Sequence, residues 1–136
     1  MEVFRILDFG SGVDVDGLIA EFNAIQPFIE LSRCDLVIAE SADATVDPDD
    51  FFASVGEARG DNTLRVIGIT ALPLKNNYFS HTNRTYDIAI ISTDQSELYT
   101  PKFSVEDYLK EEILSSVFAD ACTHERWALR YSGLPL

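Results

Sequence analysis

Cysteine, basic side chains and long apolar stretches are all scarce in this chain of 136 residues. The two cysteines, Cys34 and Cys122, stand far apart in the sequence. The opening residues, MEVFRILDFGSG, lack the basic start and the cleavage site of a signal peptide. We therefore expect reduced, largely buried thiols and a cytoplasmic protein.

No window approaches the ~18 consecutive apolar residues of a membrane span, so we expect no membrane association. A hydrophobic content of 46% suits a folded globule of this length. We expect a single domain over residues 1–136. Gly133 and Pro135 also fit the start of a linker, so the domain is expected to stand alone or to begin a longer chain.

Only ten basic residues face 23 acidic ones, which gives a net charge of -13. Direct binding of DNA or RNA needs Lys and Arg against the phosphates, and we exclude it. Residues 1–61 carry a net charge of -11, with 14 acidic and three basic side chains. This half predicts an acidic surface for another protein, whether basic or not, with five candidate contacts: Asp43, Asp47, Asp49, Asp50 and Glu57. The same charges fit an ordinary solvated surface, or an imitation of nucleic acid that inhibits a DNA-binding enzyme.

Periodicity predicts the amino-terminal elements. A strand over 3–9 is broken by glycines, and a helix follows that Asp14 or Asp16 caps. Two β-like runs, 28–32 and 35–40, come next and are either two strands or one bent strand. Asp47, Pro48 and the acidic residues after them mark the start of a second helix, which Gly60 ends.

The second half reads as a buried strand over 64–70, a hairpin and a long amphipathic helix. The hairpin turn is expected around residues 81–84, before a strong strand over 86–92. The helix is expected to begin at Ser104 and to pass Ala121, with the adjacent Glu111 and Glu112 on its solvated face. The fold class is therefore α/β, with α+β possible: a mixed sheet packed with about three helices.

Motifs for chemistry are also missing. The glycines of DFGSGVDVDG do not have the spacing of a phosphate loop, the aspartates near 43–50 do not follow the calcium-loop pattern, and no G-x-S-x-G is present. His81, His124 and Cys122 are weak metal candidates without a clear fourth ligand. We expect no cofactor and no metal. A hydrolase built on Asp8, His81, Arg84 and Asp94 remains an alternative.

Residues 66–124 resemble the core of metzincin-type zinc peptidases, most nearly the archaemetzincin-like ones. In that family a strand like VIGIT is followed by a loop, by a hairpin whose edge strand is similar to YDIAIIST, and by the zinc helix. Aligned on His124, the motif H-E-x-x-H-x-x-G-x-x-H places Leu114 and Phe118 at the helix histidines, Ser115 at the Glu and Ala121 at the Gly. The resemblance implies a peptidase shape without its zinc ligands. We thus expect a non-catalytic protein-interaction domain.

Overall fold

The computed structural model describes residues 2–39, 43–61, 64–75, 79–85, 87–94 and 104–117. These residues form a five-stranded sheet and three helices, which confirms the predicted α/β class. The strands are β1 (Glu2–Asp8), β2 (Ile29–Arg33), β3 (Arg65–Thr70), β4 (Ser80–Thr82) and β5 (Ile88–Ser92). The helices are α1 (Val15–Ile25), α2 (Pro48–Arg59) and α4 (Val105–Val117). None of these helices has the length and apolar character needed to cross a lipid bilayer.

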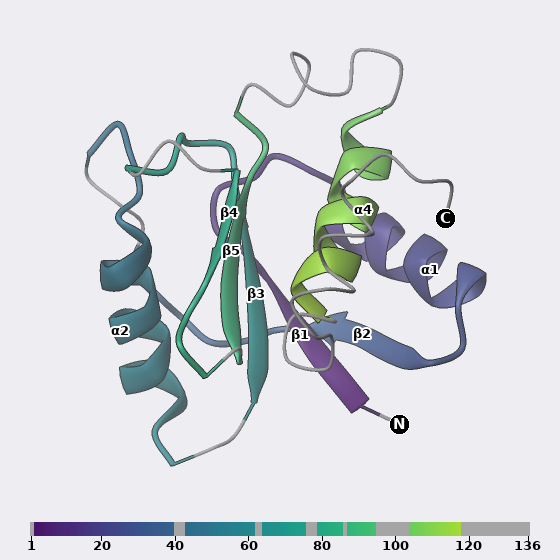
Figure 1. Ribbon diagram of the computed structural model, residues 1–136, viewed down its shortest axis with the longest axis horizontal. Coiled ribbons are helices and arrows are strands. Elements are labelled where there is room, and N and C mark those ends of the chain that lie inside the picture. Colours follow the sequence, from purple (N-terminus) through teal and green to yellow (C-terminus); the bar gives the residue numbers. More distant parts are fainter. Residues whose placement is uncertain are drawn as a thin grey trace.

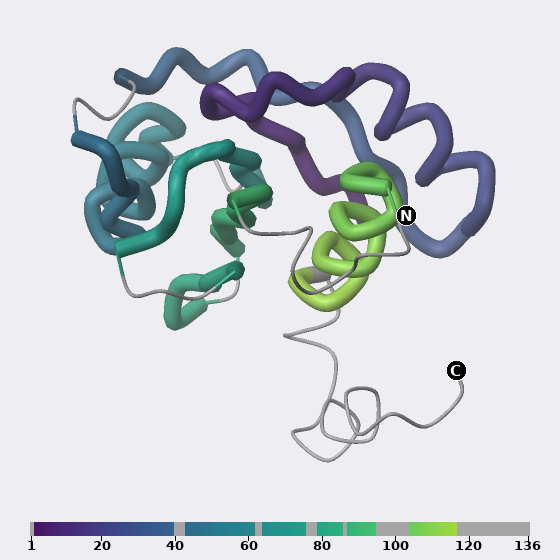
Figure 2. The backbone as a smooth tube through the Cα atoms, turned by 90° about the horizontal axis from the view of Figure 1, so that it is seen from above, coloured from purple at the N-terminus to yellow at the C-terminus, as the bar shows by residue number. Residues whose placement is uncertain are grey.

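The sheet has the strand order β2-β1-β3-β5-β4. Neighbouring strands are parallel except for β4, which runs antiparallel to β5 at one edge. Helices cover both faces: α2 lies on one side, and α1 and α4 lie on the other (Figure 1). The view from above shows the same three layers (Figure 2).

Each face of the sheet carries its own apolar core. On one face Phe22 of α1 and Ile113 of α4 pack with inward side chains of the strands. On the other face Phe51 and Val55 of α2 pack over Val66 and its neighbours. Burial of each large apolar side chain contributes roughly 1.5–3 kcal/mol, so the two cores hold the three layers together.

All three helices begin where the sequence predicts a cap. The Asp14 carboxylate accepts a hydrogen bond of 3.0 Å from the Gly17 amide, and this settles the choice between Asp14 and Asp16. Asp47 accepts one of 3.0 Å from the Asp49 amide, and Ser104 accepts one of 3.2 Å from the Asp107 amide. Each cap satisfies a helix-terminal donor that would otherwise have no partner.

Three expectations about the strands are wrong. Residues 35–39 form no strand, because after the hydrogen bond from the Cys34 amide to the Ile6 carbonyl the chain leaves the sheet and crosses toward α2. His81 lies on β4 rather than in the turn, which falls at residues 84–85. The strand 88–92 is not the edge of the sheet, since β4 pairs along its free side.

Candidate functional site

The amino-terminal end of α2 gathers four of the five predicted acidic contacts. Asp47 is the N-cap, Pro48 follows it, and Asp49 and Asp50 occupy the first turn with exposed side chains. The positive end of the helix dipole favours carboxylates here, typically by 0.3–1 kcal/mol each. Helix stabilisation uses one oxygen of Asp47 and leaves the carboxylates of Asp49 and Asp50 facing solvent.

A distant segment holds the residues before α2 in place. The Val46 amide donates to the Pro73 carbonyl at 2.9 Å, and the Lys75 amide donates to the Val46 carbonyl at 2.8 Å. These two bonds form a short parallel bridge between Val46 and Leu74. The bridge fixes the loop that carries Asp43, and it brings Lys75 beside the first turn of α2.

Two hollows lie next to this helix end. The first has a volume of about 150 Å³, and its acidic lining residues are Asp43, Asp47 and Asp50. Apolar side chains, including Phe9 and Phe51, share this lining. A cavity of this size holds a group as large as benzene, so it can take the end of one long side chain.

The second hollow has a volume of about 190 Å³ and is lined by Asp47, Pro48, Asp49, Lys75 and His81. Asp47 and Lys75 line both hollows, which makes the two neighbours on one surface. No ion pair joins Lys75 to a carboxylate among the described ranges of the chain. Counted over the described residues, this surface therefore carries one lysine and four aspartates.

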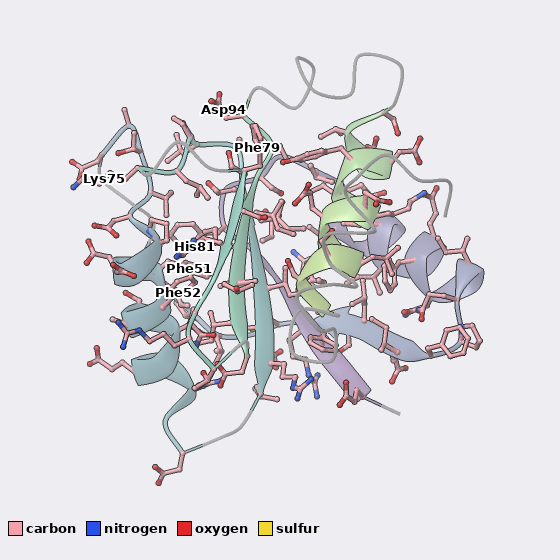
Figure 3. All side chains as sticks on the ribbon, viewed as in Figure 1. Phe51, Phe52, Lys75, Phe79, His81 and Asp94 are labelled. Carbon is pink, nitrogen blue, oxygen red and sulfur yellow. The ribbon has the colours of Figure 1, made fainter. Side chains whose placement is uncertain are left out.

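A row of aromatic rings supports this surface from below. Phe9 and Phe51 meet edge to face at 5.2 Å, Phe51 and Phe52 at 6.3 Å, and His81 stacks on Phe52 at 5.8 Å with an interplanar angle of 18°. Figure 3 shows Phe51, Phe52 and His81 together between α2 and β4. The rings tie α2 to the edge strand, so the acidic end of the helix has a rigid base.

The predicted metal ligands do not form a site in the described part of the chain. His81 is positioned by its stacking on Phe52, and the described ranges hold no group of three His, Cys, Asp or Glu side chains suited to a metal ion. His124 and Cys122 lie outside the described residues. Cys34 is a buried free thiol, and burial raises its pKa.

Glu57, the fifth predicted contact, lies about two turns from Asp50 along α2 and lines neither hollow. The same end of the helix carries Arg59, whose guanidinium pairs with Asp87 at 2.8 Å. The predicted acidic surface is therefore divided, with a compact group at the start of α2 and a single carboxylate farther along it.

The residues of the alternative hydrolase are separated. Asp8 ends β1, where its carboxylate accepts from the Ser11 amide at 2.9 Å and the Ser11 hydroxyl at 2.6 Å. Asp94 follows β5, at the same end of the parallel sheet, whereas Arg84 lies in the turn before β5. A strand of five residues spans about 17 Å, so Arg84 lies far from the two aspartates. Neither hollow is lined by Asp8, Arg84 or Asp94.

The prediction that Glu112 lies on the solvated face of α4 is wrong. Glu111 is exposed, but Glu112 is largely buried and accepts a hydrogen bond of 3.0 Å from the Ser80 hydroxyl of β4. Burial raises the pKa of the Glu112 carboxyl. Glu112 lies four positions after Tyr108 and three after Leu109. This spacing predicts that it shares the apolar side of the helix with them.

The positions that the resemblance assigns to zinc ligands are only partly described. Leu114 packs partly buried against the core shared with α1, and Ser115 is buried with its hydroxyl donating to the Glu111 carbonyl at 3.1 Å. Phe118, Ala121 and His124 lie outside the described residues.

The chain matches no protein-family model, no curated protein and no solved structure.

Proposed function

We propose that this domain is a non-catalytic binding module that recognises a basic segment of another protein at the amino-terminal end of α2. The observation that carries the proposal is the first hollow, whose lining combines Asp43, Asp47 and Asp50 with apolar side chains. An arginine or lysine side chain suits this lining, because its aliphatic stem can contact the apolar side chains while its charge meets the carboxylates.

The second hollow extends the proposed contact. It shares Asp47 and Lys75 with the first and adds Asp49 and His81, so two neighbouring basic side chains of one segment could be held together. Lys75 would repel a third charge and so limit the register of the segment. The stacked rings beneath keep the surface in place without the partner, which lowers the entropy lost on binding.

The peptidase-like part of the proposal is supported by element order. The strand β3, the β4–β5 hairpin and α4 follow one another as the resemblance implies. In the alignment on His124, Leu114 stands at the first helix histidine. Its side chain cannot bind zinc, and it packs partly buried against the core. A cytoplasmic setting is part of the same proposal and agrees with the free thiol of Cys34.

A comparative pull-down tests the function. The protein is immobilised in three forms: wild type, Asp43→Asn with Asp50→Asn, and Glu30→Gln with Glu106→Gln. Both double variants remove two charges, but Glu30 on β2 and Glu106 on α4 line neither hollow. We expect a basic protein to be retained by wild type and by the second variant, and lost from the first.

Two other outcomes are informative. Equal capture by all three forms would refute the proposed surface. Capture of a DNA-binding enzyme that free DNA displaces would favour the nucleic-acid mimic instead, because a mimic and DNA compete for one site.

A further inference from the structure

The outer edge of β2 is closed by side chains rather than by another strand. Among the residues that the structure describes, β2 is the end strand of the sheet and pairs with β1 alone. The Cys34 amide donates inward to the Ile6 carbonyl, so by alternation the backbone groups of Ile29, Leu31 and Arg33 point away from the sheet. Such unpaired groups normally form a template for another strand.

Two amide side chains at the end of α1 occupy the outward groups of Ile29 and Leu31. Asn23 donates from Nδ2 to the Leu31 carbonyl at 2.9 Å, and its Oδ1 accepts from the Leu31 amide at 2.9 Å. Gln26 donates from Nε2 to the Ile29 carbonyl at 2.8 Å, and its Oε1 accepts from the Ile29 amide at 3.0 Å. Each side chain thus offers one donor and one acceptor, as a peptide group of a neighbouring strand would.

Exposed apolar side chains lie beside this edge of β2. Ile25, the last residue of α1, is 64% exposed, and Phe28, just before β2, is 75% exposed. An open strand edge beside exposed apolar side chains is prone to association. Two copies of β2 paired antiparallel about Leu31 would set Ile29 opposite Arg33 and Glu30 opposite Ser32, so no like charges would face each other.

We propose that Asn23 and Gln26 form an edge lock that prevents β2 from pairing with β2 of a second copy of this chain. The lock acts by competition: a second strand gains hydrogen bonds to Ile29 and Leu31 only where the two amides release them. The exposed pair Ile25 and Phe28 would add apolar contact once the edge is open. This inference is independent of the acidic surface on α2.

Sedimentation velocity over a range of protein concentrations tests the lock. The variant Asn23→Ala with Gln26→Ala should self-associate at least about tenfold more tightly than wild type. Adding Arg33→Pro should return association to the wild-type level, because proline removes an outward amide and obstructs strand pairing at an edge. Unchanged association in the double variant, or association that Arg33→Pro leaves intact, would overturn the proposal.

Amide hydrogen exchange on the wild-type protein gives a second test that does not depend on the folding of any variant. The Thr82 amide faces outward on the opposite edge strand β4 and has no acceptor among the described residues. The amides of Ile29 and Leu31 should exchange at least about tenfold more slowly than that of Thr82. Exchange at equal rates would show that the lock is open in solution and would refute it.

Discussion

The guanidinium of Arg59 at the end of α2 lies 2.8 Å from the carboxylate of Asp87, the residue that precedes β5. Burial would raise the pKa of Asp87, but hydrogen bonds from Thr85, Asn83 and Arg59 outweigh it and hold the pKa at about 2. The pair joins α2 to the sheet at the end opposite the acidic hollows, so both ends of the helix are fixed.

Replacing Asp87 should cost stability in a pH-dependent way. The unfolded carboxyl titrates near ~3.9, so the stabilisation is present above about pH 4 and is lost as the pH falls through about 2. We expect Asp87→Asn to lower the free energy of unfolding by about 2 kcal/mol near neutral pH and by much less near pH 2. Urea titrations at both pH values measure the difference.

The control for this prediction is Arg33→Met, which breaks a pair with Asp16 whose side chains are 52% and 79% exposed. Exposed pairs contribute ~0–1 kcal/mol, so this change should have little effect at either pH. A loss as large as that of Asp87→Asn would contradict the account of the partly buried pair of Arg59 and Asp87.

Gly68 on β3 allows α2 to approach the sheet. A Cβ atom at this position would overlap the Cζ atom of Phe51. We expect Gly68→Ala to destabilise the protein by about 1–3 kcal/mol, and Phe51→Leu in the same chain to restore part of the loss. Thermal unfolding measures both effects.

Gly56 supplies a matched control in the neighbouring helix, because a Cβ atom there meets nothing within 4 Å. Gly56→Ala should stabilise α2 by about 0.5–1 kcal/mol. If Gly68→Ala were equally harmless, the close packing of Phe51 on β3 would be wrong.

The Glu112 carboxyl should make the protein relatively more stable in acid. Its pKa is raised in the folded state, so its stabilising effect is present at low pH and is lost as the pH rises through the folded pKa. Glu112→Gln keeps the size of the side chain and removes the titration. The variant should therefore gain stability relative to wild type between about pH 4 and pH 7, and a constant difference would contradict this.

Ser80→Ala tests the same contact from the strand. The Ser80 hydroxyl lowers the pKa of Glu112, against the larger effect of burial. Without it the pKa should rise further, which a carbon-detected NMR titration of the Glu112 side chain would record. A downward shift would mean that Ser80 does not donate to this carboxylate.

Purified protein should carry no stoichiometric zinc, in either wild type or His124→Ala. His81 is held on Phe52, and the described ranges offer no group of three ligands. Mass spectrometry of the native protein counts bound metal directly. One zinc per chain in wild type that is lost in His124→Ala would contradict the non-catalytic proposal and call for peptidase assays.

Local chemistry explains what could be predicted from the sequence. The caps Asp14, Asp47 and Ser104 accept hydrogen bonds from amides two or three residues away, so the start of each helix could be predicted from the sequence. Asp43, Asp47, Asp49 and Asp50 lie within eight positions of one another, and their gathering at one helix end follows from the cap. The caps need no pairing between distant segments, whereas the loop that carries Asp43 is also held by the bridge between Val46 and Leu74.

Features that depend on distant segments were missed. The run 35–39 has β-forming residues, but a strand needs a partner, and the pairing of β2 with β1 ends at Ile6 and Arg33 because the chain leaves the sheet after Cys34. The contribution of Lys75 to both hollows depends on the bridge between Val46 and Leu74, and no local pattern signals it.

The most direct test of the central claim is the salt dependence of partner binding, measured by calorimetry with a captured basic protein. Asp43→Asn with Asp50→Asn should raise the dissociation constant at low salt by about tenfold or more, and should make it depend less on the salt concentration. Glu30→Gln with Glu106→Gln should behave as wild type. Equal affinities and equal salt slopes for the two double variants would contradict binding at the start of α2.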